Sequence, residues 1–495
     1  MPANRHNEST LDGGAGVPMT QAPKPDAPGV GSNAVESLWA NSGAAGMLRG
    51  VFQAFDKANV RYCILHGYET YPQSVPSDVD AIIDAQITPR QLYQLLHQNR
   101  TVVGDIVRCS GRYVVLGSNT GKGPASFLTL DLTANCEVDN LPLYSGEEIL
   151  RSRKRCGEFW VPSAKVEFTC YLARSVAKYR LDDGREQRLN YLYKQGPAGC
   201  EQQVHQYWGN QNSKAILSAA ISSDWREVRG NLGSLRRALR LRAFLRRPGT
   251  VLRNKLSALC RRVARVLRPD GLNVVFLGPD GAGKSSVVEA VGPALIGAFN
   301  NWTCLGFAPP ILAHFTANGP RKTDQPHALP PRSLFASVLR AAYWFMYYTV
   351  RYPALRVALA RSTLVLNDRD FLDILVDQKR YRYGGPLWLL RLIWRLIPKP
   401  DLIILLDAPP EVLQARKQEV GFEETNRQRN AYRSLVRGLD NGRIVDASQS
   451  FECVANDVCG IIVQHLTART ARRLGHTSEK RARIVVRRTS LPHET

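Results

Sequence analysis

The 495-residue sequence predicts an α/β protein: a parallel sheet with helices on both faces forms the C-terminal half, and a smaller α+β unit precedes it. Three observations predict this fold class. From residue 271 onward, short and nearly continuous apolar segments alternate with longer helical patterns, which is typical of strands buried on both faces. The first of these segments ends in a glycine-rich turn. The part before it mixes strand-like and helix-like patterns without that alternation.

A chain of this length exceeds what one hydrophobic core supports, so we expect more than one folded unit. In chain order we expect a disordered segment rich in Gly, Pro and Ala (1–34), the α+β unit with a helical extension (35–225), a basic amphipathic linker (226–268), the parallel-sheet unit (269–467) and a basic disordered tail (468–495).

The strands of the second unit are expected at 272–277, 303–307, 362–367, 401–406 and 443–445. Ligands of such sheets bind at the carboxyl ends of the strands. The most apolar segment of this unit, Ala341 to Val350, is too short to span a bilayer. We interpret it as a buried helix rather than a membrane-contacting one.

The run LNVVFLGPDGAGKSS at residues 272–286 has the spacing of a phosphate-binding P-loop, which predicts a P-loop NTPase fold for this unit. Its glycines, which let the backbone turn N–H groups toward phosphate, are Gly278, Gly281 and Gly283. We expect Lys284 to reach the β- and γ-phosphates and the Ser285 hydroxyl to hold Mg²⁺. The other loop residues expected at this site are Asp280, Ala282 and Ser286. ATP and Mg²⁺ are therefore the expected cofactors.

Two further features point to phosphoryl transfer. Asp368 and Arg369 directly follow a predicted buried strand, where the acid can help to hold Mg²⁺ and the arginine can bind a phosphate bidentately. Basic residues at Arg416 and Lys417 precede a charged helical stretch that could close over the phosphates. For each residue of that stretch, a solvated charged helix is almost equally compatible with the pattern.

In these motifs the sequence resembles the thymidylate kinase family of P-loop nucleoside monophosphate kinases. The matching segments are GPDGAGKSS (278–286), NDRD (367–370), PDLIILLDAPPEV (400–412), the basic region 416–432 and RIVDAS (443–448). The resemblance implies that Asp280 contacts the acceptor's sugar hydroxyl, that Asp368 is the metal-associated acid and that Arg369 binds the acceptor phosphate. It assigns Arg416 and Lys417 to the mobile basic segment.

The acceptor side departs from the family. Asp370 stands where an aromatic residue usually follows the Asp-Arg pair. The segments 322–332 and 373–385 resemble a divergent branch associated with bacterial surface-polysaccharide biosynthesis. We therefore expect the acceptor to be a phosphate- or hydroxyl-bearing small molecule or a glycan. Four residues either face this acceptor or form a structural ion-pair network: Asp373, Asp377, Arg380 and Arg382.

The first unit contains its own acidic pattern. Asp78 and Asp80 lie two apart on a predicted strand and therefore share a face, and Asp131 lies inside another apolar strand. Such acids suit a second metal site for nucleotidyl transfer. The pattern resembles the nucleotidyltransferase superfamily, but Gly67-Tyr68 replaces its Gly-Ser. We favour a degenerate structural domain, or unrelated acids in turns, over an active or metal-binding site.

The net charge of +23 is concentrated in two stretches, 236–268 and 468–495. The first contains twelve Lys or Arg and no acid, and its apolar residues recur at helical spacing. We favour a solvated linker helix packed on a neighbouring domain over a peripheral contact with anionic membrane, and nucleic acid is the least favoured partner.

Scattered cysteines without a metal-ligand pattern, and no signal-peptide pattern at the N-terminus, favour a cytoplasmic protein, with the inner face of the membrane as the alternative. The main functional expectation is a P-loop kinase. One alternative is a metal-dependent nucleotidyltransferase with a regulatory P-loop. The other is a nucleotide-dependent, membrane-peripheral scaffold in polysaccharide biosynthesis. The oligomeric state stays open.

Overall fold

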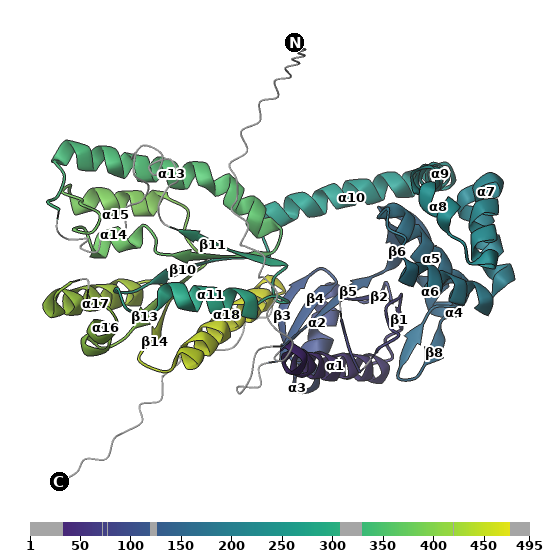
Figure 1. The fold of residues 1–495 in the computed structure, drawn as a ribbon, viewed down its shortest axis with the longest axis horizontal. Helices are drawn as coiled ribbons and strands as arrows, with labels where there is room; N and C mark the ends of the chain where they lie inside the picture. Colours follow the sequence, from purple (N-terminus) through teal and green to yellow (C-terminus); the bar gives the residue numbers. More distant parts are fainter. Residues whose placement is uncertain are drawn as a thin grey trace, which may run out of the picture.

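The computed structural model describes residues 33–71, 73–76, 78–118, 126–306, 329–418 and 420–475, with side chains from residue 43 onward. The described chain forms two units connected by a long helix (Figure 1). Residues 1–32 and 476–495, which make up most of the two segments expected to be disordered, lie outside these ranges.

The second unit contains a five-stranded parallel sheet, as the sequence predicts. Its strands are β10 (Leu272–Leu277), β11 (Asn301–Gly306), β12 (Thr363–Asp368), β13 (Leu402–Asp407) and β14 (Gly442–Asp446). Their order is β11-β12-β10-β13-β14, and all neighbouring pairs are parallel. The strand that leads into the P-loop is therefore central, and the strand that ends in Asp368 lies beside it.

Side chains alternate along each buried strand, so apolar residues lie on both faces of this sheet. Helices cover both faces. Val274 and Phe276 of β10 pack in one cluster, and Val275 and Leu277 pack in another on the opposite face. The first cluster includes α11 (Lys284–Ala294) and α18 (Phe451–Arg473), and the second includes α14 (Leu372–Val376) and α17 (Phe422–Arg437). The other helices of this unit are α13 (Leu334–Ala360), α15 (Leu387–Leu396) and α16 (Pro410–Arg416).

The first unit is α+β. Its sheet has the order β1-β2-β5-β4-β3, and only β2 and β5 are parallel. The strands are β1 (Tyr62–Ile64), β2 (Val79–Ile83), β3 (Asp105–Ser110), β4 (Tyr113–Ser118) and β5 (Ser126–Thr133), with two short ribbons, β6 (Asn135–Val138) with β7 (Leu141–Ser145) and β8 (Lys154–Cys156) with β9 (Phe159–Val161). The helices are α1 (Asn33–Lys57), α2 (Pro89–Gln98), α3 (Arg100–Val103), α4 (Gly146–Ser152), α5 (Ala164–Ala177), α6 (Asp183–Gln195) and α7 (Pro197–Ser222).

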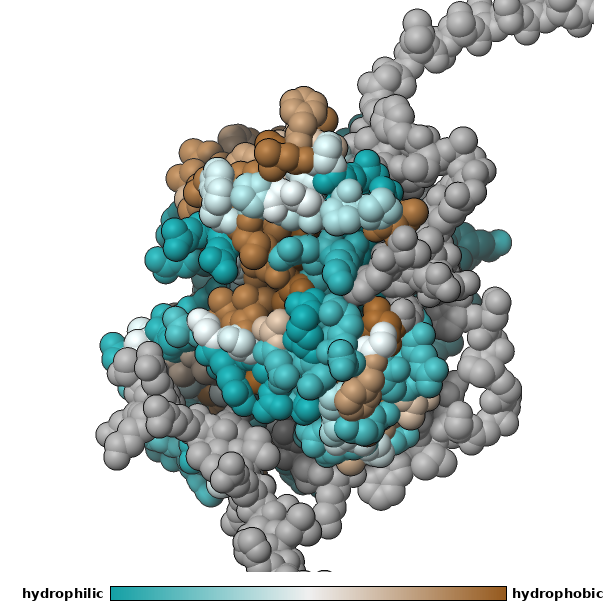
Figure 2. Space-filling model, turned by 90° about the vertical axis from the view of Figure 1, so that its left-hand side faces the viewer, coloured by the Kyte–Doolittle hydropathy of each residue, from teal (hydrophilic) through white to brown (hydrophobic). Residues whose placement is uncertain are grey.

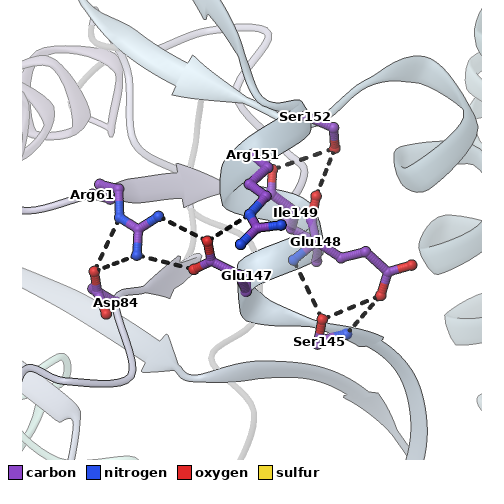
Figure 3. A network of polar contacts seen from close by, with 8 residues as sticks. All are labelled: Arg61, Asp84, Ser145, Glu147, Glu148, Ile149, Arg151 and Ser152. Atoms are coloured by element: carbon purple, nitrogen blue, oxygen red, sulfur yellow. Dashed lines mark hydrogen bonds and ion pairs between the residues drawn. The ribbon is translucent and has the colours of Figure 1, made fainter.

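Helix α4 is held at its start by a capping box and by Arg61 (Figure 3). The Ser145 hydroxyl accepts a hydrogen bond from the Glu148 N–H at 3.3 Å, and the Glu148 carboxylate accepts one from the Ser145 N–H at 3.3 Å. Arg61 donates to Glu147 on the helix and to Asp84 after β2. These contacts connect α4 to the edge of the first sheet.

We expect Ser145→Ala to lower the free energy of unfolding by about 1 kcal/mol, because an N–H at the start of α4 loses its acceptor. Ser163 begins α5 with similar backbone angles but makes no side-chain capping hydrogen bond, so Ser163→Ala is the matched control. Urea unfolding of both variants measures the difference. Equal losses in the two would show that the Ser145 capping bond contributes nothing.

The basic segment forms α8 (Arg226–Gly230), α9 (Leu232–Arg246) and α10 (Pro248–Leu267). Helix α9 packs into the core of the first unit through Leu235 and Leu239. Helix α10 crosses to the second unit (Figure 1), where Val266 O and Leu267 O accept hydrogen bonds from Arg356 of α13.

The two units also contact each other directly through β3 and α18. The Thr470 hydroxyl of α18 donates to Val107 O of β3 at 3.0 Å, and Val107 packs in the core cluster of the second unit. Helix α18 continues to Arg473, past the boundary at residue 467 that the sequence predicts, and Arg473 pairs with Asp270 before β10. The end of the second unit is therefore part of the contact between the units.

The interpretation of Ala341–Val350 as a buried helix is wrong for one of its faces. Ala341 and Trp344 are buried, but Met346 is 54% exposed and Val350 73%. This segment is part of α13, which packs on its neighbours along one side only. Among the described helices, none is long and apolar enough to cross a membrane.

Candidate active site

The P-loop follows β10 and requires glycine for two separate reasons. Gly278 has φ +149°, and a Cβ on it would lie 2.7 Å from Leu406 O of the neighbouring strand. Gly283 has φ +82° and begins α11 in the left-handed conformation. The loop therefore bends tightly against β13 and ends at the N-terminus of a helix, which favours anion binding.

Lys284 is the first residue of α11, and its side chain turns back over the loop. Its ammonium donates to Gly278 O at 2.8 Å and to Pro279 O at 2.9 Å. Burial, with Arg369 nearby, lowers the pKa of Lys284 to about 8. At neutral pH this lysine remains largely protonated, so the loop encloses a cation that is 6% exposed.

Ser285 and Asp368 bring together the two oxygen groups expected for Mg²⁺. Phe276 of β10 lies beside Asp368 in the sheet register, so the P-loop and the end of β12 meet. The Ser285 hydroxyl donates to Asp368 Oδ2 at 2.5 Å, while Asp368 Oδ1 is buried and makes no hydrogen bond to the described residues. A buried carboxylate oxygen without a partner beside a hydroxyl fits a hard divalent cation.

Asp280 lies between two arginines from different segments. Arg369, which follows β12, donates to Asp280 Oδ1, and Arg380, which follows α14, donates to Asp280 Oδ2. All three side chains are partly buried. Arg369 has φ +79°, a conformation that non-glycine residues rarely adopt, and its N–H donates to Phe276 O at 3.2 Å. The backbone therefore holds Arg369 toward the P-loop.

Two buried acids, Asp370 and Asp373, lie in the segment directly after Arg369. Asp373 is fully buried, and it accepts hydrogen bonds from Tyr432 at 2.6 Å and from the Asp370 N–H at 2.7 Å. Asp370 accepts a hydrogen bond from the Tyr348 hydroxyl, and burial raises the pKa of Asp370 to about 6. Asp370, the departure from the family pattern, therefore connects the Asp-Arg turn to α13.

The four residues that the sequence grouped on the acceptor side separate in the structure. Arg380 reaches the P-loop acid, whereas Arg382 is directed elsewhere and donates to Pro330 O at 3.1 Å. Asp373 and Asp377 are buried, and Asp377 accepts a hydrogen bond from Gln428 at 3.1 Å. Of the four, Arg380 thus contacts the acid of the P-loop, and the two acids are buried.

The basic segment after β13 lies close to the loop. Arg416 donates to Ala447 O at 2.8 Å, so it ties α16 to the segment after β14. A Cβ on Gly281 would lie 3.4 Å from Lys417 Cβ, which places Lys417 beside the P-loop. The roles of Arg416 and Lys417 at the phosphates stay predictions.

Sequence reasoning missed the pairing of Arg429 with Asp407. Arg429 of α17 donates to both carboxylate oxygens of Asp407, at 2.7 and 3.1 Å, at the carboxyl end of β13. Asp407 follows an apolar strand as Asp368 does, and that signal was available in the sequence. Nothing local in the sequence links Arg380 to Asp280, which lies 100 positions earlier.

In the first unit, Asp80 and Asp131 are direct neighbours on the parallel strands β2 and β5. Asp80 forms an ion pair with Arg174 of α5 at 2.9 Å, and Asp78 is exposed. In the part of the chain that the structure describes, no group of three or more His, Cys, Asp or Glu residues is arranged to hold a metal ion. Both the favoured structural role of these three acids and the alternative of metal binding stay predictions.

Comparison with known proteins agrees with the kinase-type site. No family model matches the chain. It is 28% identical over 209 residues to the thymidylate kinase of Xanthomonas oryzae pv. oryzae (strain PXO99A), covering 41% of this chain and 88% of that protein. Over 229 residues it is 26% identical to the thymidylate kinase of Xanthomonas campestris pv. campestris (strain B100), covering 44% of this chain and 94% of that protein. The chain therefore contains a domain that is similar to thymidylate kinases.

Proposed function

We propose that this protein transfers the γ-phosphoryl group of ATP to the phosphate of a nucleoside monophosphate. The observation that carries the proposal is the position of Asp280 between Arg369 and Arg380, beside Lys284. Here two guanidinium groups, which bind phosphate through a planar fork of donors, lie next to the phosphate-binding loop.

Each residue has a role that its position supports. Lys284 and the N-terminus of α11 neutralise charge that spreads over the γ-phosphoryl oxygens. Ser285 and Asp368 would hold Mg²⁺, which would neutralise negative charge on the phosphates of ATP. Arg369 and Arg380 orient the acceptor phosphate so that its oxygen lies in line with the bond between the γ-phosphorus and its bridging oxygen. Asp280 keeps the two guanidinium groups apart and oriented.

The same arrangement favours a phosphate acceptor over a sugar hydroxyl. A hydroxyl must lose its proton as the new oxygen–phosphorus bond forms, so it needs a base, whereas an ionised phosphate oxygen does not. Both carboxylate oxygens of Asp280, the acid of the P-loop, already accept hydrogen bonds from guanidinium groups. A glycan or sugar acceptor, a role in polysaccharide biosynthesis, nucleotidyl transfer by the first unit and a regulatory role for the P-loop remain the alternatives.

The test is transfer from ATP labelled at the γ-position or at the α-position, with nucleoside monophosphates, sugars and oligosaccharides as acceptors. We expect the γ-label in a nucleoside diphosphate. Transfer of the γ-label to a sugar would show that the acceptor is a sugar and not a nucleoside monophosphate. Incorporation of the α-label into any product would favour nucleotidyl transfer. If neither form of labelled ATP gave a labelled product, the kinase proposal would be wrong.

We expect Asp368→Asn to raise the Mg²⁺ concentration for half-maximal phosphoryl transfer by about tenfold or more, because the site loses an ionised oxygen ligand. Asp457 on α18 is exposed, so Asp457→Asn is the control with the same chemical change. Initial rates against free Mg²⁺ at saturating ATP measure the shift. An unchanged Mg²⁺ requirement would remove Asp368 from the metal site.

A further inference from the structure

Helix α13 has a second apolar face that no described part of the protein covers. Its buried face contains Ala341 and Trp344. The large residues of the other face are among the most exposed apolar side chains of the protein, and they recur at helical spacing: Phe335 (80%), Leu339 (63%), Met346 (54%) and Val350 (73%). Figure 2 views the molecule from the side on which α13 begins and shows apolar side chains gathered at the top.

Helix α15 repeats this pattern next to α13. Leu390 and Ile393 pack with Trp344 of α13 in one buried cluster, so the two helices lie side by side (Figure 1). On α15, Trp388 (64% exposed), Leu392 (44%) and Leu396 (62%) form a separate stripe at spacings of four residues. Exposed apolar surface on two adjacent helices of a folded protein marks an interaction site.

The long connecting helix α10 extends this surface. Its apolar residues that recur at helical spacing are all exposed, at 42 to 68%: Leu252, Leu256, Leu259, Val263 and Val266. The sequence favoured a linker helix packed on a neighbouring domain, but this stripe is not packed against the described chain. Helices α10 and α13 meet at the Arg356 contact and run along the same edge of the molecule (Figure 1).

The charge of these helices indicates which kind of partner covers their exposed apolar surface. Helices α10, α13 and α15 contain no aspartate or glutamate. Exposed basic residues lie on α10 and α15, for example Arg262 and Arg391, whereas Arg351 of α13 donates to Asn367 of β12. A helix with exposed apolar residues, arginines and no acid suits an anionic lipid surface, which attracts the cations and takes up the apolar side chains. Trp388 has the amphipathic ring that is enriched at such interfaces.

A second copy of the chain fits this exposed apolar surface less well than a membrane does. A symmetric dimer through this surface would bring the same face of both copies together. The exposed arginines of α10 and α15 would then approach those of the other copy without acids on these helices to pair with them, and like charges at an interface are costly. An anionic bilayer provides the opposite charge over the whole surface.

We propose that the exposed apolar faces of α13 and α15, together with α10, dock the protein on the surface of an anionic membrane. The second unit, and not only the basic segment 236–268, then makes the lipid contact. The helices lie in the interface plane, since no described helix is long and apolar enough to span it. The proposal does not depend on the acceptor or on kinase activity.

The experiment is co-sedimentation of the full chain with vesicles of phosphatidylcholine alone or of phosphatidylcholine mixed with phosphatidylglycerol. We expect binding to the anionic vesicles only, reduced by high salt. The triple variant Phe335→Ser/Leu339→Ser/Trp388→Ser should bind at least about tenfold more weakly, because three large apolar side chains no longer enter the lipid. These residues are exposed, and circular dichroism tests whether the variant is folded.

The control variant is Ile221→Ser/Ile296→Ser, which removes exposed apolar residues outside the three helices and should bind like the wild type. Three outcomes would overturn the proposal. They are no binding of the wild type to anionic vesicles, equal binding of the triple variant, and a wild-type dimer in sedimentation equilibrium that the triple variant converts to a monomer.

Discussion

Replacing Lys284 with alanine is expected to lower the turnover of phosphoryl transfer by at least about two orders of magnitude. The ammonium of Lys284 is buried under the P-loop, where it donates to Gly278 O and Pro279 O. In this low-dielectric position it stabilises charge on the transferred group far more than a solvated cation does. Steady-state transfer of γ-label to the acceptor measures the loss.

Lys214→Ala is the matched control, since Lys214 is an exposed lysine on α7 of the first unit. Circular dichroism and thermal unfolding separate a chemical effect from a folding defect in Lys284→Ala. Near wild-type transfer by a folded Lys284→Ala protein would contradict the kinase assignment. Loss of vesicle binding is not expected, because the α13–α15 surface does not include the P-loop.

Replacing Arg380 with alanine is expected to raise the KM for the acceptor by about 10- to 100-fold, with a small change in the KM for ATP. The magnitude follows from the loss of a charged hydrogen bond of about 1.5–3 kcal/mol. Arg380 donates to Asp280 on the acceptor side of the P-loop, in line with the proposed orientation of the acceptor phosphate. Initial rates at varied acceptor and saturating ATP measure the change.

The chain offers a close control for this prediction. Arg382 lies two positions away in the same segment, but it donates to Pro330 O instead of the P-loop acid. Arg382→Ala should therefore leave the acceptor KM nearly unchanged. Arg380→Lys should recover only part of the loss, because an ammonium keeps the charge without the planar fork. Equal effects of the Arg380 and Arg382 changes would show that Arg380 has no special position at the acceptor.

Much of the second unit was predictable from the sequence. Strands buried on both faces are apolar at nearly every position, so β10 and β13 appear in the sequence as continuous apolar runs. The P-loop is contiguous in sequence, so its spacing alone predicts its conformation and its ligand. Asp368 follows an apolar strand, and its meeting with Ser285 at 2.5 Å agrees with the rule that ligands bind at strand carboxyl ends.

The first unit was less predictable. Its strands are short, and Asp80 and Asp131 become neighbours only through the parallel pairing of β2 and β5. That pairing does not decide their role. Arg174 of α5 reaches Asp80 from another element, and no local pattern in the sequence indicates that ion pair.

By itself, the sequence predicted the donor side of the proposed site, because the P-loop is one continuous segment whose glycines, lysine and serine act locally. Only the tertiary structure brought the residues of the proposed acceptor side together, since Asp280, Arg369 and Arg380 come from separate segments. It also decided which face of α13 is covered. That helix is apolar nearly all round, so its periodicity does not distinguish the buried face from the exposed one; the packing of Trp344 against α15 does.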